Sequence, residues 1–175
     1  ARRATLKDAI LYLFGVSLIL SAIEVLFFAL KYYVVSLYLY DLGFIGKLFS
    51  PLLLIITMPL LAIGLACLIV ILSFIGAGIL HILAKLLGGK GDYEASYKIL
   101  AFSSAADLLT LIPFFGWLIA GIMKMVVVYH GLKILHKLSS TKAIVVVILP
   151  IVVVLVIVAI THIYIHAILM GVSLP

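Results

Sequence analysis

The sequence predicts an all-α fold: a polytopic transmembrane helical bundle of five spans with a cytoplasmic N-terminus, formed by one domain over residues 1–175. The first observation is composition. Hydrophobic residues make up 67% of the chain and charged residues only 10%, with a mean hydropathy of +1.48. A soluble fold has too little interior for so much apolar surface, so lipid must act as the solvent. The other two observations are the lengths of the apolar segments and the placement of Lys and Arg around them.

The apolar segments are long enough to cross a membrane, because a helix rises about 1.5 Å per residue and the hydrocarbon core is about 30 Å thick. The run from Pro51 to Leu87 is too long for one span and barely long enough for two, and no polar turn divides it. We predict one long tilted helix that begins near Pro59, after an interfacial connector at 41–58. The predicted spans are about 9–35, 59–87, 96–112, 117–138 and 142–166.

Lys and Arg fall mainly on one side of these spans, which favours a cytoplasmic N-terminus. Only Lys31 and Lys47 lie outside, and Lys124 lies within a span. The cytoplasmic set is Arg2, Arg3, Lys7, Lys85, Lys90, Lys98, Lys133, Lys137 and Lys142. The net charge of +6 therefore fits membrane orientation and anionic headgroups, and no nucleic-acid partner is expected.

An ordered series of residues runs from about His81 to Pro150. It comprises His81, Lys85, Gly88-Gly89-Lys90-Gly91, Tyr93, Tyr97, Leu100-Ala101-Phe102-Ser103, Pro113, Gly131-Leu132, His136, Lys142-Ala143 and Pro150. In order and spacing this series resembles the YIP family, the Ypt/Rab-interacting-protein-like integral membrane proteins and their prokaryotic relatives. The resemblance implies five transmembrane helices, a cytoplasmic N-terminus and no settled activity for the prokaryotic members.

Eukaryotic members of that family look like trafficking factors that engage small GTPases, largely through a cytoplasmic N-terminal region. This sequence offers only about eight residues before its first span. Binding of Rab-type GTPases is therefore not carried over by the resemblance. The compact form resembles a prokaryotic-type member, which predicts the prokaryotic cell membrane as its location.

Ionisable residues at depth in a membrane are costly, so each is a hypothesis of function. Asp107 and Lys124 are equidistant from the turn near Phe115, and an antiparallel hairpin would pair them at similar depth. The pair either fixes the register of the hairpin or belongs to a site for a proton or cation. The complete candidate layer is Glu24, Asp107, Lys124, Ser103 and Ser104.

The histidines form two further candidate groups. His81 and His130 lie at similar distances from the cytoplasmic ends of their spans, so they could face each other as a proton-sensing or metal-binding layer, or make ordinary hydrogen bonds. His162 and His166 share one helix face by their i, i+4 spacing. They are candidate metal ligands with Asp41 as a third, although an interfacial pair without metal is the simpler interpretation.

The longest polar loop of the sequence is rich in glycine, as a phosphate-binding loop is. It lacks the Gly-Lys-Ser/Thr ending and the preceding strand that a P-loop needs, so we interpret it as a cytoplasmic turn that could contact lipid phosphates. Its residues of interest are Gly88, Gly89, Lys90, Gly91, Tyr93 and Lys98.

Two functions remain open. The first is a non-enzymatic membrane-organising or partner-binding scaffold that needs no cofactor, with membrane lipids, other membrane proteins or a second copy as partners. The small-xxx-small pairs of Ala62 with Ala66 and Ser73 with Ala77 suit close helix packing within the chain or between copies. The alternative is an ion- or proton-conducting channel or transporter that uses Glu24, Asp107 and Lys124.

Overall fold

The computed structural model describes residues 4–38 and 51–169, and every element in these ranges is helical. The elements are α1 (Leu6–Tyr38), α3 (Pro51–Leu86), α4 (Tyr93–Ser103), the 3₁₀ helix η2 (Ser104–Leu111), α5 (Gly116–Leu135) and α6 (Ser140–Leu169). Four segments are long and apolar enough to cross a membrane: Leu6–Lys31, Ile56–Leu86, Gly116–Leu135 and Ser140–His166. The chain is therefore an all-helical integral membrane protein.

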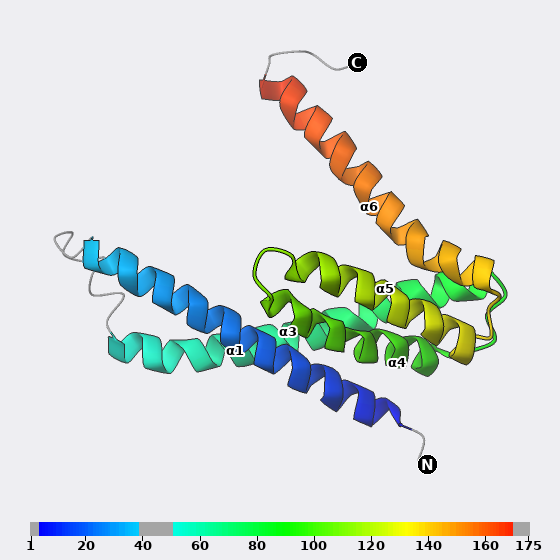
Figure 1. Ribbon diagram of the computed structural model, residues 1–175, viewed down its shortest axis with the longest axis horizontal. Coiled ribbons are helices and arrows are strands. Elements are labelled where there is room, and N and C mark those ends of the chain that lie inside the picture. The colour runs from blue at the N-terminus through cyan, green and yellow to red at the C-terminus, as the bar shows by residue number, and fades with distance from the viewer. Residues whose placement is uncertain (1–3, 39–50, 170–175) are drawn as a thin grey trace.

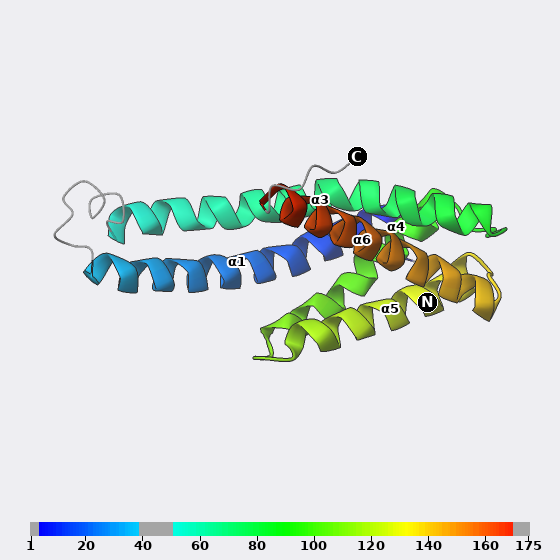
Figure 2. The same cartoon turned by 90° about the horizontal axis from the view of Figure 1, so that it is seen from above.

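The long helices α1 and α3 lie side by side and run in opposite directions (Figures 1 and 2). Small side chains of α3 make this approach possible. Ala62, Ala66, Ser73 and Ala77 are all buried in a helix whose larger residues mostly face outward. The predicted small-xxx-small pairs thus serve packing within the chain.

Helix α3 differs from the predicted span 59–87. It begins at Pro51, so residues 51–58 belong to the same helix, and Pro59 lies inside it. A proline interrupts only one backbone hydrogen bond, and in lipid a helix that continues satisfies the remaining backbone groups better than a break would. The rest of the predicted connector, 41–50, lies outside the described residues.

The boundaries of the predicted third and fourth spans also shift by a few residues. Helix α4 begins at Tyr93 because the Asp92 carboxylate caps it, accepting a hydrogen bond of 2.8 Å from the Ala95 amide. The second half of the predicted span 96–112 is the tighter helix η2. Helix α5 ends at Leu135, before Lys137, whose φ of 54° lies in the left-handed region.

Helices α4 and η2 fold back against α5 as a hairpin that packs on α3 and α1. The turn passes through Phe114, with φ at 66°, to Gly116. A Cβ at Gly116 would collide with the carbonyl oxygen of Leu109 and lie 2.9 Å from that of Thr110, so only glycine allows this close approach. At the other end of the hairpin, Gly131 gives room to Ile99.

The buried core lies around α4. One cluster joins Ala84, Ile99, Leu132, Leu138, Ala143 and Val146, and a second joins Ala9, Leu13, Ala77, Tyr97 and Ala101. Helix α6 contributes only through its first turns, and all its residues from Val152 to His166 are exposed. Figure 1 shows this half of α6 rising away from the other helices.

Candidate functional site

One end of the bundle, where α3 leads into α4 and α5 leads into α6, is called here the basic end (Figure 1). Helix α3 stops there in a Schellman motif. Gly88 has φ at 86°, its amide donates to the Lys85 carbonyl at 2.9 Å, and the Gly89 amide donates to the Ala84 carbonyl at 2.8 Å. The glycine-rich loop 88–92 is thus an ordered helix cap, which agrees with its interpretation as a turn.

This loop is fastened to the connection between α5 and α6. The Lys90 amide donates a hydrogen bond of 2.9 Å to the His136 carbonyl. The approach is so close that a Cβ at Gly91 would lie 2.8 Å from Nδ1 of His136 and 2.9 Å from the Leu135 carbonyl oxygen. A Cβ at Gly89 would lie 2.7 Å from the Ala84 carbonyl oxygen. The glycines therefore allow the close contact between the two connections.

Beneath the loop, three side chains from three parts of the chain form a buried polar group, which we call the histidine–serine cluster. Oγ of Ser96 on α4 lies 2.8 Å from Nε2 of His136 and 3.2 Å from Nδ1 of His81 on α3. Ser96 and His136 are both fully buried. The cluster thus joins the ends of α3 and α5 through α4.

His136 is held in its neutral form. Burial lowers its pKa below the ordinary value of 6.5, and the positive charge of Lys85 and the neighbouring His81 act in the same direction. Asp92 has the opposite, smaller influence. Nδ1 of His136 is buried and has no hydrogen-bond partner in the part of the chain that the structure describes.

Two tyrosines continue the polar packing along α4. The Tyr93 hydroxyl donates a hydrogen bond of 2.8 Å to the Phe74 carbonyl. The fully buried Tyr97 hydroxyl lies 3.0 Å from Oγ of Ser73, which also donates to the Val70 carbonyl. Tyr93, predicted as part of the cytoplasmic loop, is therefore an anchor between α4 and α3.

The predicted pairing of His81 with His130 is wrong. His130 is exposed on α5, and its Nδ1 donates to the Val126 carbonyl of its own helix at 2.8 Å. The ring that lies near His81 is that of His136, with centroids 5.9 Å apart. Helical periodicity explains the difference, because His130 and His136 are six residues apart and therefore face different directions on α5.

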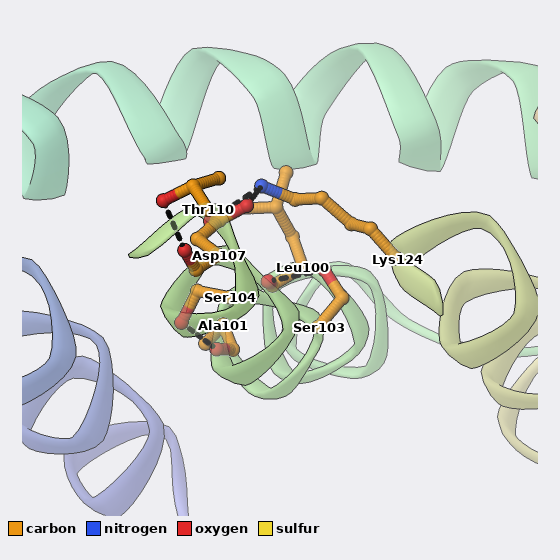
Figure 3. A network of polar contacts seen from close by, with 7 residues as sticks. All are labelled: Leu100, Ala101, Ser103, Ser104, Asp107, Thr110 and Lys124. Carbon is orange, nitrogen blue, oxygen red and sulfur yellow. Dashed lines mark hydrogen bonds and ion pairs between the residues drawn. The ribbon is translucent and has the colours of Figure 1, made fainter. Parts of the chain in front are cut away.

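The second polar region is the ion pair between η2 and α5 (Figure 3). Nζ of Lys124 lies 2.9 and 2.7 Å from the two carboxylate oxygens of Asp107. The side chains are 40% and 32% exposed respectively, so the pair is only half-buried by protein. The antiparallel hairpin brings these residues together as its geometry predicts.

The other predicted members of the charged layer do not join this pair. Ser103 and Ser104 donate to the carbonyls of Leu100 and Ala101 in α4, at 2.7 and 2.6 Å (Figure 3). Glu24 is exposed on α1, and no hydrogen bond or ion pair among the described residues includes it. Glu24 therefore does not join the candidate layer, because α1 turns it outward.

The predicted metal candidates lie far along α6. The rings of His162 and His166 are 6.0 Å apart and both residues are exposed. Asp41 lies outside the described residues. Within residues 4–38 and 51–169, no group of three or more His, Cys, Asp or Glu side chains is placed to hold a metal ion.

A family model for the Yip1 domain matches residues 4–161, nearly the whole chain. The chain belongs to the Yip1 domain family. The resemblance inferred from the series between His81 and Pro150 is thus confirmed. No curated protein and no solved structure is significantly similar to the chain.

The surface of this Yip1 domain is strongly basic at the end that carries the histidine–serine cluster. Five exposed lysines lie there: Lys85, Lys90, Lys133, Lys137 and Lys142. Lys98 differs from them because it is half-buried and pairs with Glu94 one helical turn away, at 2.6 Å. Lys98 therefore contributes less free charge to the surface than the loop interpretation assumed.

Sequence reasoning did not assign a site to Ser96 and His136 of the Yip1 domain, although they form the centre of the cluster. The one sequence feature that pointed to His136 is its place in the series that resembles the YIP family. Its partner could not be found from spacing, because Ser96 and His136 are 40 residues apart and meet only when α4 packs on α5.

Proposed function

We propose that this Yip1 domain is a non-enzymatic membrane-organising scaffold that binds a partner at its basic end. The observation that carries the proposal is the fastening of the glycine-rich loop to the α5–α6 connection. Two connections that would otherwise move separately are joined by the bond from Lys90 to the His136 carbonyl. They present Lys90 and Lys137 on one ordered surface, which reduces the entropy lost when a partner binds.

We further propose five spans with the N-terminus in the cytoplasm. Helices α4 and η2 contain 11 and 8 residues. At about 1.5 and 2.0 Å per residue they extend over about 32 Å, close to the thickness of about 30 Å that a span must cross. The described lysines support this orientation, because Lys31 alone lies near the opposite end, apart from Lys124 within the hairpin. The basic end then faces the cytoplasm.

The channel alternative receives less support from the geometry. It required a carboxylate beyond the one that neutralises Lys124, and Glu24 does not reach the pair. An ion pair between one cation and one carboxylate, joining the two arms of a hairpin, is sufficient to fix the register of that hairpin. We therefore assign Asp107 and Lys124 to structure.

The test of the scaffold uses the complete chain in its native membrane. A photo-crosslinking amino acid replaces Lys90 at the basic end, or Trp117 at the opposite end of α5, which is also exposed. We expect protein adducts from position 90 that are absent from position 117. The charge reversal Lys137→Glu should reduce them, while Lys31→Glu should not.

Equal adducts at both positions, or adducts that Lys137→Glu leaves unchanged, would overturn the scaffold. Lys90 is the better probe than Tyr93, because Tyr93 supports α3 through its bond to Phe74. A change at Tyr93 would alter the fold and the surface together.

A further inference from the structure

The unpartnered Nδ1 of His136 faces the backbone of the glycine-rich loop. The glycines at 89 and 91 face it without side chains, and their close approach leaves no room for one. Among the described residues it is the one buried side-chain nitrogen or oxygen without a hydrogen-bond partner. Such an atom in an otherwise satisfied cluster requires an explanation.

Hydrogen-bond counting determines where the proton of His136 lies. With the proton on Nε2, the imidazole donates to Ser96 Oγ, and the Ser96 hydroxyl can then donate to Nδ1 of His81. Nδ1 of His136 keeps a bare lone pair, which can stay unpartnered at little cost. The other neutral tautomer would bury an N–H that has no acceptor.

A second proton on His136 would create that same buried N–H and add a positive charge. From α3, His81 and Lys85 disfavour this charge. From the loop, Asp92 favours it, but its influence is the smallest and its carboxylate already caps α4. From α6, Nζ of Lys142 approaches the loop at Gly88. The imidazolium can be hydrated only if the loop moves away from α5.

We infer that His136 is a proton-binding site that releases the glycine-rich loop from the α5–α6 connection when the solution at the basic end is mildly acidified. Its meaning as regulation of partner binding rests on the function proposed above, whereas the proton-linked opening itself does not. Opening breaks the bond from Lys90 to the His136 carbonyl and separates the two parts of the binding surface.

The direction of the pH dependence follows from the lowered pKa of His136. When the loop opens, the ring becomes hydrated and its pKa returns toward 6.5, so the open form binds more protons than the closed form. The closed form is fully stable above that value. It loses stability as pH falls from about 6.5 toward the lower pKa of the closed state.

Hydrogen exchange of the intact protein in lipid nanodiscs tests the opening. The reporters are the amides of Gly89 and Lys90, with protection expressed relative to the intrinsic exchange rate at each pH. Between about pH 7.5 and about pH 5.5, protection should fall by a factor whose upper limit is about ten, set by one pH unit below the ordinary imidazole pKa. Unchanged protection would overturn the inference.

The variant His136→Gln retains an amide donor for Ser96 but cannot titrate, so its loop protection should not depend on pH. His130→Gln is the matched control, because His130 is exposed and lies outside the cluster, and it should keep the loss seen in the unmodified chain. Persistence of the loss in His136→Gln would assign it to another group and overturn the inference.

If His136→Gln does not fold, NMR of ¹⁵N-labelled histidine in the unmodified chain gives the answer. A His136 ring that titrates while Gly89 and Lys90 stay protected would overturn the inference. Photo-crosslinking at neutral pH tests the scaffold separately, since exchange needs no partner. Absence of adducts in that experiment would overturn the scaffold proposal and would not affect the proton-linked opening.

Discussion

The histidine–serine cluster and the Asp107–Lys124 pair are both polar contacts in an apolar protein, yet they are built differently. The centre of the cluster, Ser96 and His136, is fully buried, and the cluster joins the ends of α3 and α5 through α4. The ion pair is 32% and 40% exposed and joins η2 to α5 within a single hairpin. Burying neutral polar side chains costs little free energy once their hydrogen bonds are made. A charged side chain removed from water needs the opposite charge of a partner to compensate the lost hydration.

This difference separates two roles. The cluster lies where connections meet, so changing it alters how three helices are held relative to one another. The ion pair acts on one hairpin, so changing it alters the register of that hairpin. Substitutions in the two regions should therefore differ in size, in what rescues them and in their dependence on pH.

The largest effect is expected from Asp107→Asn, which leaves the Lys124 ammonium without its carboxylate. An unpaired lysine at depth costs about 3 kcal/mol on insertion scales, so the free energy of unfolding should fall by about that amount. Unfolding of the purified protein in mixed micelles by a denaturing detergent measures this loss.

The double variant Asp107→Asn/Lys124→Gln is the informative control for this loss. It removes both charges and should recover most of the stability, because no uncompensated charge remains. A double variant as unstable as the single one would show that the pair has a role beyond compensating its own charges.

The pair and the cluster also differ in how far sequence predicts them. Asp107 and Lys124 could be paired because both belong to one hairpin whose turn is marked by Pro113 and Gly116, so depth follows from counting residues. The class of fold followed equally well from apolar segment lengths and composition. Local periodicity and spacing are sufficient for contacts of this kind.

The cluster could not be predicted in the same way. Its residues come from three separate segments, and the direction of each side chain depends on the rotation of its helix, which a uniformly apolar helix does not reveal. The same limit explains Glu24, whose depth could be counted but whose orientation on α1 could not. It also explains why spacing pairs His81 with His130, whereas the structure places His136 beside it.

The next largest effect is expected from Gly91→Ala at the basic end. The added Cβ would lie 2.8 Å from His136 Nδ1 and 2.9 Å from a backbone oxygen, so the loop or the α5 terminus must shift. Overpacking of this kind costs about 2 kcal/mol. The midpoint of thermal unfolding should fall accordingly in a fluorescence-detected melt.

Gly121→Ala is the matched control for that change, since nothing lies within 4 Å of a Cβ at this position of α5. It should be neutral or slightly stabilising, because alanine is the better helix former. Equal losses for the two substitutions would mean that the close contact at Gly91 does not limit stability.

A smaller effect is expected from Tyr97→Phe, which removes one buried hydroxyl beneath the cluster. Ser73 keeps its bond to the Val70 carbonyl, so no donor is left without a partner and the loss should be about 1 kcal/mol. Tyr164→Phe on the exposed part of α6 is the control and should change nothing. A loss above that of Gly91→Ala would place the cooperative centre of the fold at Tyr97.

The smallest effect is expected from Glu24→Gln, and it decides between scaffold and channel. Glu24 is exposed on α1 and has no bond to the Asp107–Lys124 pair, so stability should change by less than about 0.5 kcal/mol. Liposomes that contain the purified chain should show the same proton and cation flux as empty ones, with or without the substitution. A flux that Glu24→Gln abolishes would bring Glu24 back into a conducting layer, through a rotation of α1 that the structure does not contain. Both stability and flux must be measured, because unfolding alone cannot distinguish an exposed Glu24 that takes part in conduction from an exposed Glu24 that does not.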